Sequence, residues 1–331
     1  MSGNEVNRPV IAITDADYYA PSFVEEKMPR LLELGQVLLA ATKNVTALIE
    51  ALSEADVAVI RRVWMTRQVF AACPRLVGVV KFGARVEKID IPAATEYGVI
   101  VANSPAVIIA VAEAALTLML VLTKPLFTMV EAARSGGIPD SDVRGTELFG
   151  KTLGVVGCGR IGSHLARIGQ GLGMTVLAYD AYVSDVPGCK MVDLHTLLRE
   201  SDIVSLHIPD TPETHHLIDQ EKLRLMKPTA ILINTARGGA VDEEALYRAL
   251  RDGRLRGAGL DVVEHEPITP DHPLLTLPNV VMTPHALART WEALDKVVAI
   301  IQDEVEAILK GEWPEYTLNR SVQRKTPIRP F

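Results

Sequence analysis

The sequence of 331 residues has few aromatic residues, few cysteines and no long uninterrupted hydrophobic run. Its three cysteines, Cys73, Cys158 and Cys189, are odd in number and widely spaced, with no CxxC pair and no Cys/His ligand cluster. This pattern argues against a disulfide framework and a structural zinc site, so we predict no bound metal. Hydrophobic residues make up 48% and charged residues 23%, fractions typical of a globular chain rather than a disordered or fibrous one.

The most apolar stretch runs from Ala106 to Leu122 and is interrupted by Glu113. A membrane span needs about 20 apolar residues and rarely carries a central carboxylate, so we interpret this stretch as a buried helix and expect no membrane partner. The first residues, MSGNEVNRP, are polar and contain no signal-peptide core. We therefore expect a cytoplasmic protein.

Basic residues are outnumbered, 34 against 41 acidic ones, which gives a net charge of −7. Nucleic-acid-binding proteins are more often basic, so DNA and RNA are disfavoured as partners. Small anionic ligands stay possible because local fields, and not the net charge, decide their binding.

Short apolar runs alternate with amphipathic segments along most of the chain, which predicts two doubly wound α/β domains with parallel sheets. In the first third we expect strands at 9–14, 37–40, 57–61 and 76–82, with helices at 23–34, 45–52 and 66–73. A long helix over 104–135 should begin at Ser104-Pro105, with Ser104 as its cap, and kink at Pro125. After the turn-rich 134–142, strands are expected at 152–157, 175–180, 203–208, 230–235, 257–263 and 279–283, with helices beginning near Arg160, Asp193, Asp219 and Asp242. A last helix should cover 289–310.

A glycine-rich turn follows the predicted strand 152–157 and opens a helix, with the sequence Gly157-Cys158-Gly159-Arg160-Ile161-Gly162. In this context GxGxxG predicts a dinucleotide site. The first glycine allows the tight turn, the second lets the pyrophosphate approach, and the third allows close helix–strand packing. Asp180 ends the next strand, where a carboxylate binds ribose hydroxyls and repels a 2′-phosphate, so NAD is favoured over NADP.

Three ionisable residues follow predicted strands of this same domain: Arg237, Glu266 and His285. Each alone could be a surface or packing residue. At the carboxyl ends of neighbouring strands they would offer a cation for a carboxylate, a titratable imidazole, and a carboxylate able to orient it.

The sequence resembles the D-isomer-specific 2-hydroxyacid dehydrogenases, a family that includes D-3-phosphoglycerate and D-lactate dehydrogenases and glyoxylate/hydroxypyruvate reductases. The similarity lies in LGVVGCGRIG, SDIVSLHIPDTPETHHLI, MKPTAILINTARGGAVDEEAL, GAGLDVVEHEP and NVVMTPHALARTWEA, and more weakly in GARVEKIDIPAATEYGVIVANSPA. The resemblance implies a Rossmann NAD-binding domain, 103–293, inserted in a flavodoxin-like substrate domain formed by 1–102 plus 294–331. It also implies a homodimer in which the 105–135 segment supplies the interface. The alternative is that this segment is only an intramolecular core helix.

By this resemblance, Arg237 binds the carboxylate of a 2-hydroxyacid or 2-oxoacid, His285 is the general acid/base, and Glu266 orients the imidazole. Further cofactor contacts are implied at His207, Pro209, Thr214, Thr235, Ala236 and Asp261, the last of them to the carboxamide. His207 could instead be a strand-end packing residue.

The substrate loop of the family reads G-x-G-x-D-N-[IV]-D, and here it reads Gly83-Ala84-Arg85-Val86-Glu87-Lys88-Ile89-Asp90. The resemblance implies that Gly83, Ala84 and Arg85 contact the substrate. Arg85 would then be a second cation for a substrate with an extra anionic or polar group. Alternatively, Arg85 points to solvent or pairs with Glu87.

Two other functions stay open. An NADH-sensing, corepressor-like binding protein would lack a catalytic residue or carry an added peptide-binding extension, whereas Arg237, Glu266 and His285 are all present. The second alternative is a dehydrogenase that oxidises an atypical donor such as phosphite. Formate enzymes of the family carry Gln where this chain has Glu266, which argues against formate.

Overall fold

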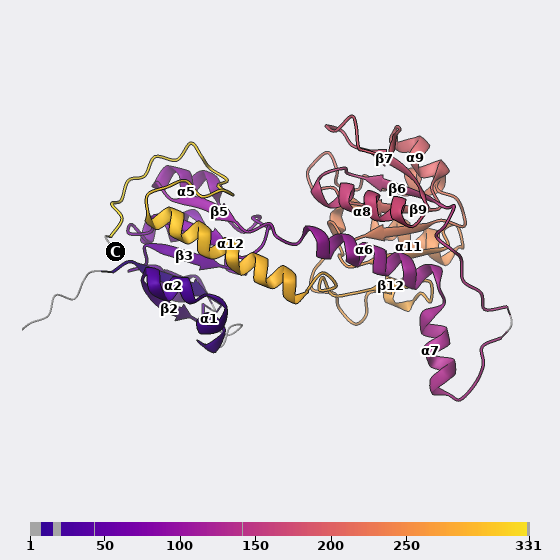
Figure 1. Cartoon of the computed structure of the whole chain (residues 1–331), viewed down its shortest axis with the longest axis horizontal. Helices are drawn as coiled ribbons and strands as arrows, with labels where there is room; N and C mark the ends of the chain where they lie inside the picture. The colour runs from indigo at the N-terminus through magenta and orange to yellow at the C-terminus, as the bar shows by residue number, and fades with distance from the viewer. Residues whose placement is uncertain (1–7, 16–20, 43, 141, 330–331) are drawn as a thin grey trace, which may run out of the picture. The chain divides into compact units, whose positions relative to one another are not determined.

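The computed structural model describes residues 8–15, 21–42, 44–140 and 142–329, coloured along the chain in Figure 1. The chain divides into two compact units. The first comprises Met1–Val107 and Thr290–Phe331, and the second comprises Ile108–Arg289. The boundaries therefore fall after residues 107 and 289, where the sequence analysis placed them after 102 and 293.

The first unit is built on a parallel five-stranded sheet with the order β2-β1-β3-β4-β5. Its strands are β1 Val10–Thr14, β2 Gln36–Ala40, β3 Val57–Ile60, β4 Gly78–Lys81 and β5 Ile100–Asn103. Its helices are α1 Pro21–Lys27, α2 Pro29–Leu34, α3 Val45–Leu52, α4 Arg67–Ala72, α5 Ile91–Tyr97 and α12 Trp291–Leu309. Helices cover both faces, so strands such as β3 are buried throughout, which explains their continuous apolar runs.

Helix α12 joins the first unit although it lies near the end of the chain. In Figure 1 it is the long yellow helix that crosses this sheet, and it packs on β3, β4, β5 and α2. Its Val297, Ile301 and Ile308 share one buried cluster with Ile11 and Ile13 of β1. The C-terminal segment thus completes the core of the N-terminal unit.

The second unit contains a seven-stranded sheet with the order β12-β11-β10-β9-β6-β7-β8, in which all neighbours pair in parallel. Its strands are β6 Thr152–Val156, β7 Thr175–Tyr179, β8 Lys190–Met191, β9 Ile203–Leu206, β10 Ile231–Asn234, β11 Gly257–Leu260 and β12 Val280–Met282. The strand order reverses between β6 and β9. Such a reversal is the position at which open α/β sheets bind their ligands.

Helices pack on both faces of this second sheet. One face is covered by α6 Ile108–Thr123 and α8 Arg160–Gly171, the other by α9 Leu194–Glu200, α10 Gln220–Leu225 and α11 Glu243–Arg251. The carboxylates of Asp193, Asp219 and Asp242 each accept a hydrogen bond from the backbone N–H three residues later, at the starts of α9, α10 and α11. The predicted fold class, with its two parallel α/β sheets, is confirmed.

Two predicted helices were wrong in detail. The 23–34 segment forms two helices that meet at Met28-Pro29. The helix expected from Ser104 begins instead at Ile108, because the Ser104 hydroxyl is used elsewhere: it accepts a hydrogen bond from Gly83 N at 2.7 Å and donates to Lys81 O at 3.0 Å.

The break expected at Pro125 is present, and α7 Leu126–Arg134 follows it at an angle of 64° to α6. In the described part of the chain, no helix alone has the length and apolar character needed to cross a membrane. The bent pair α6–α7 passes that test only when its two helices are taken together. Helix α7 has no buried residue, and Figure 1 shows it projecting from the second sheet.

Candidate functional site

The glycine-rich turn lies between β6 and α8 of the second unit. Gly157 has φ 93°, and a Cβ there would lie 2.7 Å from His207 O. A Cβ on Gly162 would lie 1.9 Å from Gly157 O, so this position allows the close approach of helix and turn. In contrast, among the described residues, apart from the glycine's own chain neighbours, no atom lies within 4 Å of a Cβ built on Gly159. The space in front of Gly159 and the N–H groups of Arg160 and Ile161 in the first turn of α8 fit a pyrophosphate.

Asp180 follows β7 and holds this turn closed. Its carboxylate accepts hydrogen bonds from Cys158 N at 2.6 Å, Tyr182 N at 2.8 Å and Val183 N at 3.0 Å. Desolvation raises the pKa of Asp180, but these three N–H donors outweigh it and bring the pKa below its ordinary value. Asp180 is therefore an anion beside the turn at neutral pH.

The loop after β9 carries the residues expected on the adenine side. The His207 ring nitrogen Nε2 lies 2.9 Å from the Ser205 hydroxyl, and burial lowers the pKa of His207 to about 4, so the ring is neutral near pH 7. The Thr214 hydroxyl donates to Pro209 O at 2.6 Å and accepts from Thr211 N at 2.9 Å, which closes a short turn. The contacts of these residues to a cofactor stay a prediction.

The loop after β10 carries Thr235, Ala236 and Arg237. Buried Asn234 fixes this loop, because its side chain accepts from Ala236 N at 3.0 Å and donates to Arg237 O at 2.8 Å. The buried Thr235 hydroxyl has no hydrogen-bond partner among the described residues. A buried, unpaired hydroxyl is costly unless a ligand satisfies it, so Thr235 fits a polar atom of a bound dinucleotide. The half-buried Arg237 side chain donates to Ala236 O through Nη1 at 2.8 Å.

His285 and Glu266 come together at the ends of β12 and β11. Nδ1 of His285 lies 2.7 Å from Oε1 of Glu266, and the two side chains are 33% and 29% exposed. This is the predicted imidazole–carboxylate pair. Strands β10, β11 and β12 are neighbours in the sheet and run in parallel, so Arg237 follows the next strand at the same edge.

Buried Asp261 determines the shape of the loop that carries His285. Its Oδ1 accepts from Thr283 Oγ1 at 2.6 Å, Ala286 N at 3.0 Å and Leu287 N at 3.2 Å. His285 itself adopts φ 52°, a left-handed conformation that the surrounding hydrogen bonds maintain. The predicted contact between Asp261 and a carboxamide therefore has to use Oδ2, since Oδ1 already holds the loop.

The predicted substrate loop lies in the first unit, after β4. Gly83 N is held by Ser104, and Ala84 O accepts from the Asn103 side chain at 3.0 Å. Nε of Arg85 lies 3.7 Å from Oε1 of Glu87, with both side chains about half exposed. The pairing of Arg85 with Glu87, one of the two alternatives in the sequence analysis, is thus present as a weak surface contact.

The sequence analysis missed two buried groups near these loops. Lys81, directly before the 83–85 loop, is 7% exposed and donates to Phe82 O at 2.8 Å. Burial, together with the charge of Arg61, lowers the pKa of Lys81 to about 8. The sequence did contain a signal for Lys81, because a lysine inside the apolar run 76–82 indicates a buried polar group. Asn234, inside the apolar run 230–235, is the second buried group and could have been found in the same way.

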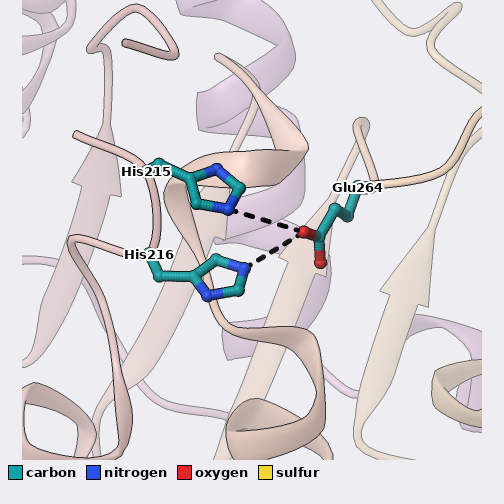
Figure 2. A group of neighbouring side chains, drawn as sticks. All are labelled: His215, His216 and Glu264. Carbon is teal, nitrogen blue, oxygen red and sulfur yellow. Dashed lines mark hydrogen bonds and ion pairs between the residues drawn. The ribbon is translucent and has the colours of Figure 1, made fainter. Parts of the chain in front are cut away.

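A third group that the sequence did not reveal consists of His215, His216 and Glu264, whose ring nitrogens and carboxylate converge in Figure 2. The two histidines are adjacent in sequence, but Glu264 comes from the segment after β11. Nothing in the sequence placed that carboxylate beside them.

Comparisons with known proteins agree with this architecture. The sequence profile described as D-isomer specific 2-hydroxyacid dehydrogenase, NAD binding domain, matches residues 116–286. A D-3-phosphoglycerate dehydrogenase of Methanocaldococcus jannaschii is 40% identical over 302 residues, which cover 89% of this chain and 57% of the relative. A glyoxylate reductase of Korarchaeum cryptofilum is 38% identical over 301 residues, 88% of each chain.

Among solved structures, the D-lactate dehydrogenase of Aquifex aeolicus in complex with NAD and lactic acid is similar, with a TM-score of 0.79 and 32% identity. The match covers 91% of this chain and 96% of that one. This chain thus spans little more than half of the phosphoglycerate dehydrogenase, but most of the glyoxylate reductase and of the lactate dehydrogenase.

Proposed function

Because this chain belongs to the D-isomer-specific 2-hydroxyacid dehydrogenase family, we propose that it interconverts a small D-2-hydroxyacid and its 2-oxoacid with NAD(H) as cofactor. The observation that carries the proposal is the 2.7 Å pair of His285 and Glu266 at the sheet edge where Arg237 also lies. Bound NAD(H) would supply the hydride acceptor or donor for C2 of the substrate.

His285 moves the proton of this reaction. With Nδ1 paired to Glu266, we assign Nε2 of the imidazole to the proton transfer with the substrate oxygen. In oxidation Nε2 accepts the hydroxyl proton as the C2–O bond becomes a carbonyl. In reduction it returns that proton to the oxygen. The Glu266 carboxylate favours the imidazolium that forms, and it orients the ring.

Arg237 binds the substrate carboxylate in this proposal. Its planar guanidinium can donate two parallel hydrogen bonds to a carboxylate, and the Asn234 side chain holds the loop from which it extends. In the first unit, we assign the Gly83-Ala84-Arg85 loop, with Lys81 directly before it, to binding of an anionic or strongly polar substrate group.

Asp180 supports NAD as the cofactor over NADP. It is an anion at the end of β7 next to the glycine-rich turn, where a 2′-phosphate would be repelled. We assign the remaining cofactor contacts to Gly157, Gly159, Arg160, Ile161, Gly162, His207, Pro209, Thr214, Thr235, Ala236 and Asp261.

We also propose that the chain forms a homodimer through α7. Phe127 on this helix is 62% exposed, Leu126 is 47% exposed, and Ile138 beyond it is 94% exposed. Apolar side chains gathered on a helix with no buried residue are typical of an interface between chains.

The decisive experiment is a steady-state assay of a panel of 2-oxoacids with NADH and with NADPH. We expect turnover of at least one 2-oxoacid, with the higher kcat/KM for NADH. If no 2-oxoacid or hydroxyacid is turned over while NADH binds, the enzymatic proposal is wrong. The corepressor-like alternative then takes its place. Turnover of phosphite with NAD, but of no hydroxyacid, would favour the atypical donor.

A further inference from the structure

His215, His216 and Glu264 bring three metal-binding atoms to one point on the surface of the second unit. Nε2 of His216 lies 3.1 Å from Oε1 of Glu264, Nε2 of His215 lies 3.8 Å from the same oxygen, and all the ligand atoms lie within 4.8 Å of one another. The two rings are stacked, with centroids 4.1 Å apart and an interplanar angle of 18°. Figure 2 shows both Nε2 atoms directed at the same carboxylate.

The backbone around the cluster holds these side chains in place. The turn closed by Thr214 and Pro209 precedes His215, and His216 takes φ 51° while its N–H donates to Gly239 O at 2.7 Å. On the other side, Glu264 N donates to a carboxylate oxygen of Glu243 at 2.7 Å. The cluster is thus fixed at both of its ends, although its side chains are partly exposed.

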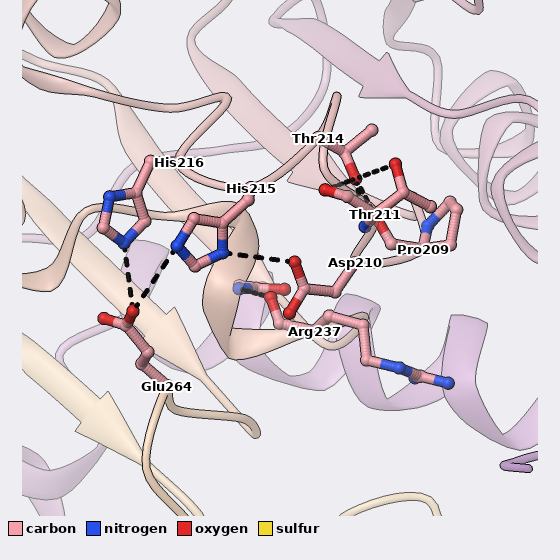
Figure 3. Close-up of polar contacts among 9 residues, drawn as sticks. Pro209, Asp210, Thr211, Thr214, His215, His216, Arg237 and Glu264 are labelled. Carbon is pink, nitrogen blue, oxygen red and sulfur yellow. Dashed lines mark hydrogen bonds and ion pairs between the residues drawn. The ribbon is translucent and has the colours of Figure 1, made fainter. Parts of the chain in front are cut away.

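Asp210 supplies the outer partner that metal-binding histidines usually have. Its Oδ1 lies 3.4 Å from Nδ1 of His215, as Figure 3 shows. A Cβ on Gly239 would lie 2.4 Å from Asp210 Oδ2, so a larger residue at that position would displace this carboxylate from its place beside His215. If Nδ1 donates its proton to Asp210, Nε2 of His215 presents a lone pair to the Glu264 oxygen, and a cation between them removes the repulsion.

We propose that His215, His216 and Glu264 bind one divalent transition-metal ion of the zinc class. Zinc bonds of about 2.0–2.1 Å to nitrogen and oxygen in a tetrahedron require ligand atoms about 3.3–3.4 Å apart, and the 3.1 and 3.8 Å separations lie on either side of that value. Two imidazoles and one carboxylate suit zinc, cobalt or nickel better than calcium or magnesium, which prefer oxygen. We assign the fourth position to a water molecule, because the three side chains are partly exposed.

This site is separate from the residues assigned to catalysis. In Figure 3 the guanidinium of Arg237 points away from the histidine pair. Glu264 lies two residues before Glu266, but the Glu266 carboxylate pairs with His285. The proposal therefore does not depend on the dehydrogenase activity.

Calorimetric titration of the metal-stripped full chain with Zn²⁺ tests the proposal, and Co²⁺ absorption reports the ligand type. We expect one Zn²⁺ per chain and a cobalt spectrum of tetrahedral nitrogen and oxygen coordination without a thiolate band. His216→Gln and Glu264→Gln should each weaken binding by at least about tenfold. Asp210→Asn should weaken it by about 10- to 100-fold, as losses of an outer partner do.

His195→Gln is the matched control, because His195 is an exposed histidine on α9 outside the cluster. It should keep the wild-type affinity, and so should His285→Gln. Equal affinity of wild type and Glu264→Gln, or loss of binding in His285→Gln, would overturn the proposal. If Glu264→Gln does not fold by circular dichroism, His215→Gln and His216→Gln, at half-exposed positions, decide in its place.

Discussion

Nδ1 of His285 and Oε1 of Glu266 lie 2.7 Å apart, although each residue stands on a different loop after neighbouring strands. This pair gives the ring one orientation, and in the proposed mechanism Nε2 exchanges the proton with the substrate oxygen. His285→Gln should therefore lower kcat by about 10²- to 10⁴-fold, the usual contribution of a general acid/base. NADH binding, followed by fluorescence titration, should stay near wild type. Near-normal turnover of this variant would contradict the proton-transfer role.

Glu266→Gln keeps the shape of that partner and removes its charge. We expect a smaller loss of kcat than in His285→Gln, because the ring keeps a neighbour of the same shape but loses the carboxylate that accepts from Nδ1 and orients it. The measurement is kcat of both variants at one pH. A wild-type kcat in Glu266→Gln would mean that the carboxylate does not orient the His285 ring.

Asp180→Ala should reduce discrimination against NADPH. The substitution removes an anion whose pKa is below its ordinary value, so the repulsion of a 2′-phosphate disappears. The ratio of kcat/KM for NADH to that for NADPH should fall by about tenfold or more. Because Asp180 also accepts three backbone hydrogen bonds, Tm should fall as well. Asp185→Ala, a nearby acidic position, is the control and should leave the ratio unchanged.

Asp261→Ala should act on catalysis through the 283–287 loop. Its Oδ1 accepts hydrogen bonds from Thr283, Ala286 and Leu287. Without this oxygen the loop loses the conformation that orients the His285 side chain. We expect kcat to fall by about 10²-fold or more, as a small misplacement of a catalytic group does. Asp261→Asn retains one acceptor oxygen and should recover part of kcat. Identical kcat in the two variants would show that the acceptor does not position the loop.

Glu304 should make the stability of the first unit depend on pH. It is buried on α12, and desolvation raises its pKa from 4.5 to about 7. Between those values the folded chain holds a proton that the unfolded chain has released, so the free energy of unfolding falls as pH rises from about 4.5 to 7. The loss amounts to about 3 kcal/mol at most. Chemical denaturation from pH 5 to 8 should show it as a change in the difference between the unfolding free energies of wild type and Glu304→Gln, since that difference cancels the opposite contribution of His207, whose pKa burial lowers to about 4.

Phe127→Glu should separate the proposed dimer. The side chain is 62% exposed on α7, and a carboxylate at that position would oppose its copy or face an apolar partner surface. Light scattering should show dimers of wild type and monomers of the variant. His195→Gln, a change on α9, should leave the wild type's dimeric mass. A monomeric wild type at micromolar concentration would remove the proposal.

Local patterns were enough to predict much of this fold. The caps at Asp193, Asp219 and Asp242 and the turn at Gly157 depend on residues close in sequence, so their spacing predicts them. The buried parallel strands follow from continuous apolar runs between such signals. The pair of His285 and Glu266 was expected from the resemblance to a family. From spacing alone, each of the two could equally be an ordinary surface residue.

What escaped prediction depends on partners distant in sequence. Ser104 is a residue type that often caps helices, but its hydroxyl forms hydrogen bonds with the backbone of Lys81 and Gly83 instead. Asp261 was expected to bind the carboxamide of the cofactor, and its Oδ1 also holds the loop that carries His285. In both cases the side chain forms hydrogen bonds with residues distant in sequence, and the local sequence alone does not indicate these bonds.

The apolar contacts of α12 with β3 and β4 affect the order in which parts of the chain can fold. Until Thr290 and the residues after it have been synthesised, one face of the N-terminal sheet lacks part of its apolar cover, because Ile11 and Ile13 share their buried cluster with residues of α12. The inserted unit has its own complete cores and needs no later segment. On the ribosome the middle of this protein should therefore become protease-resistant before its beginning does.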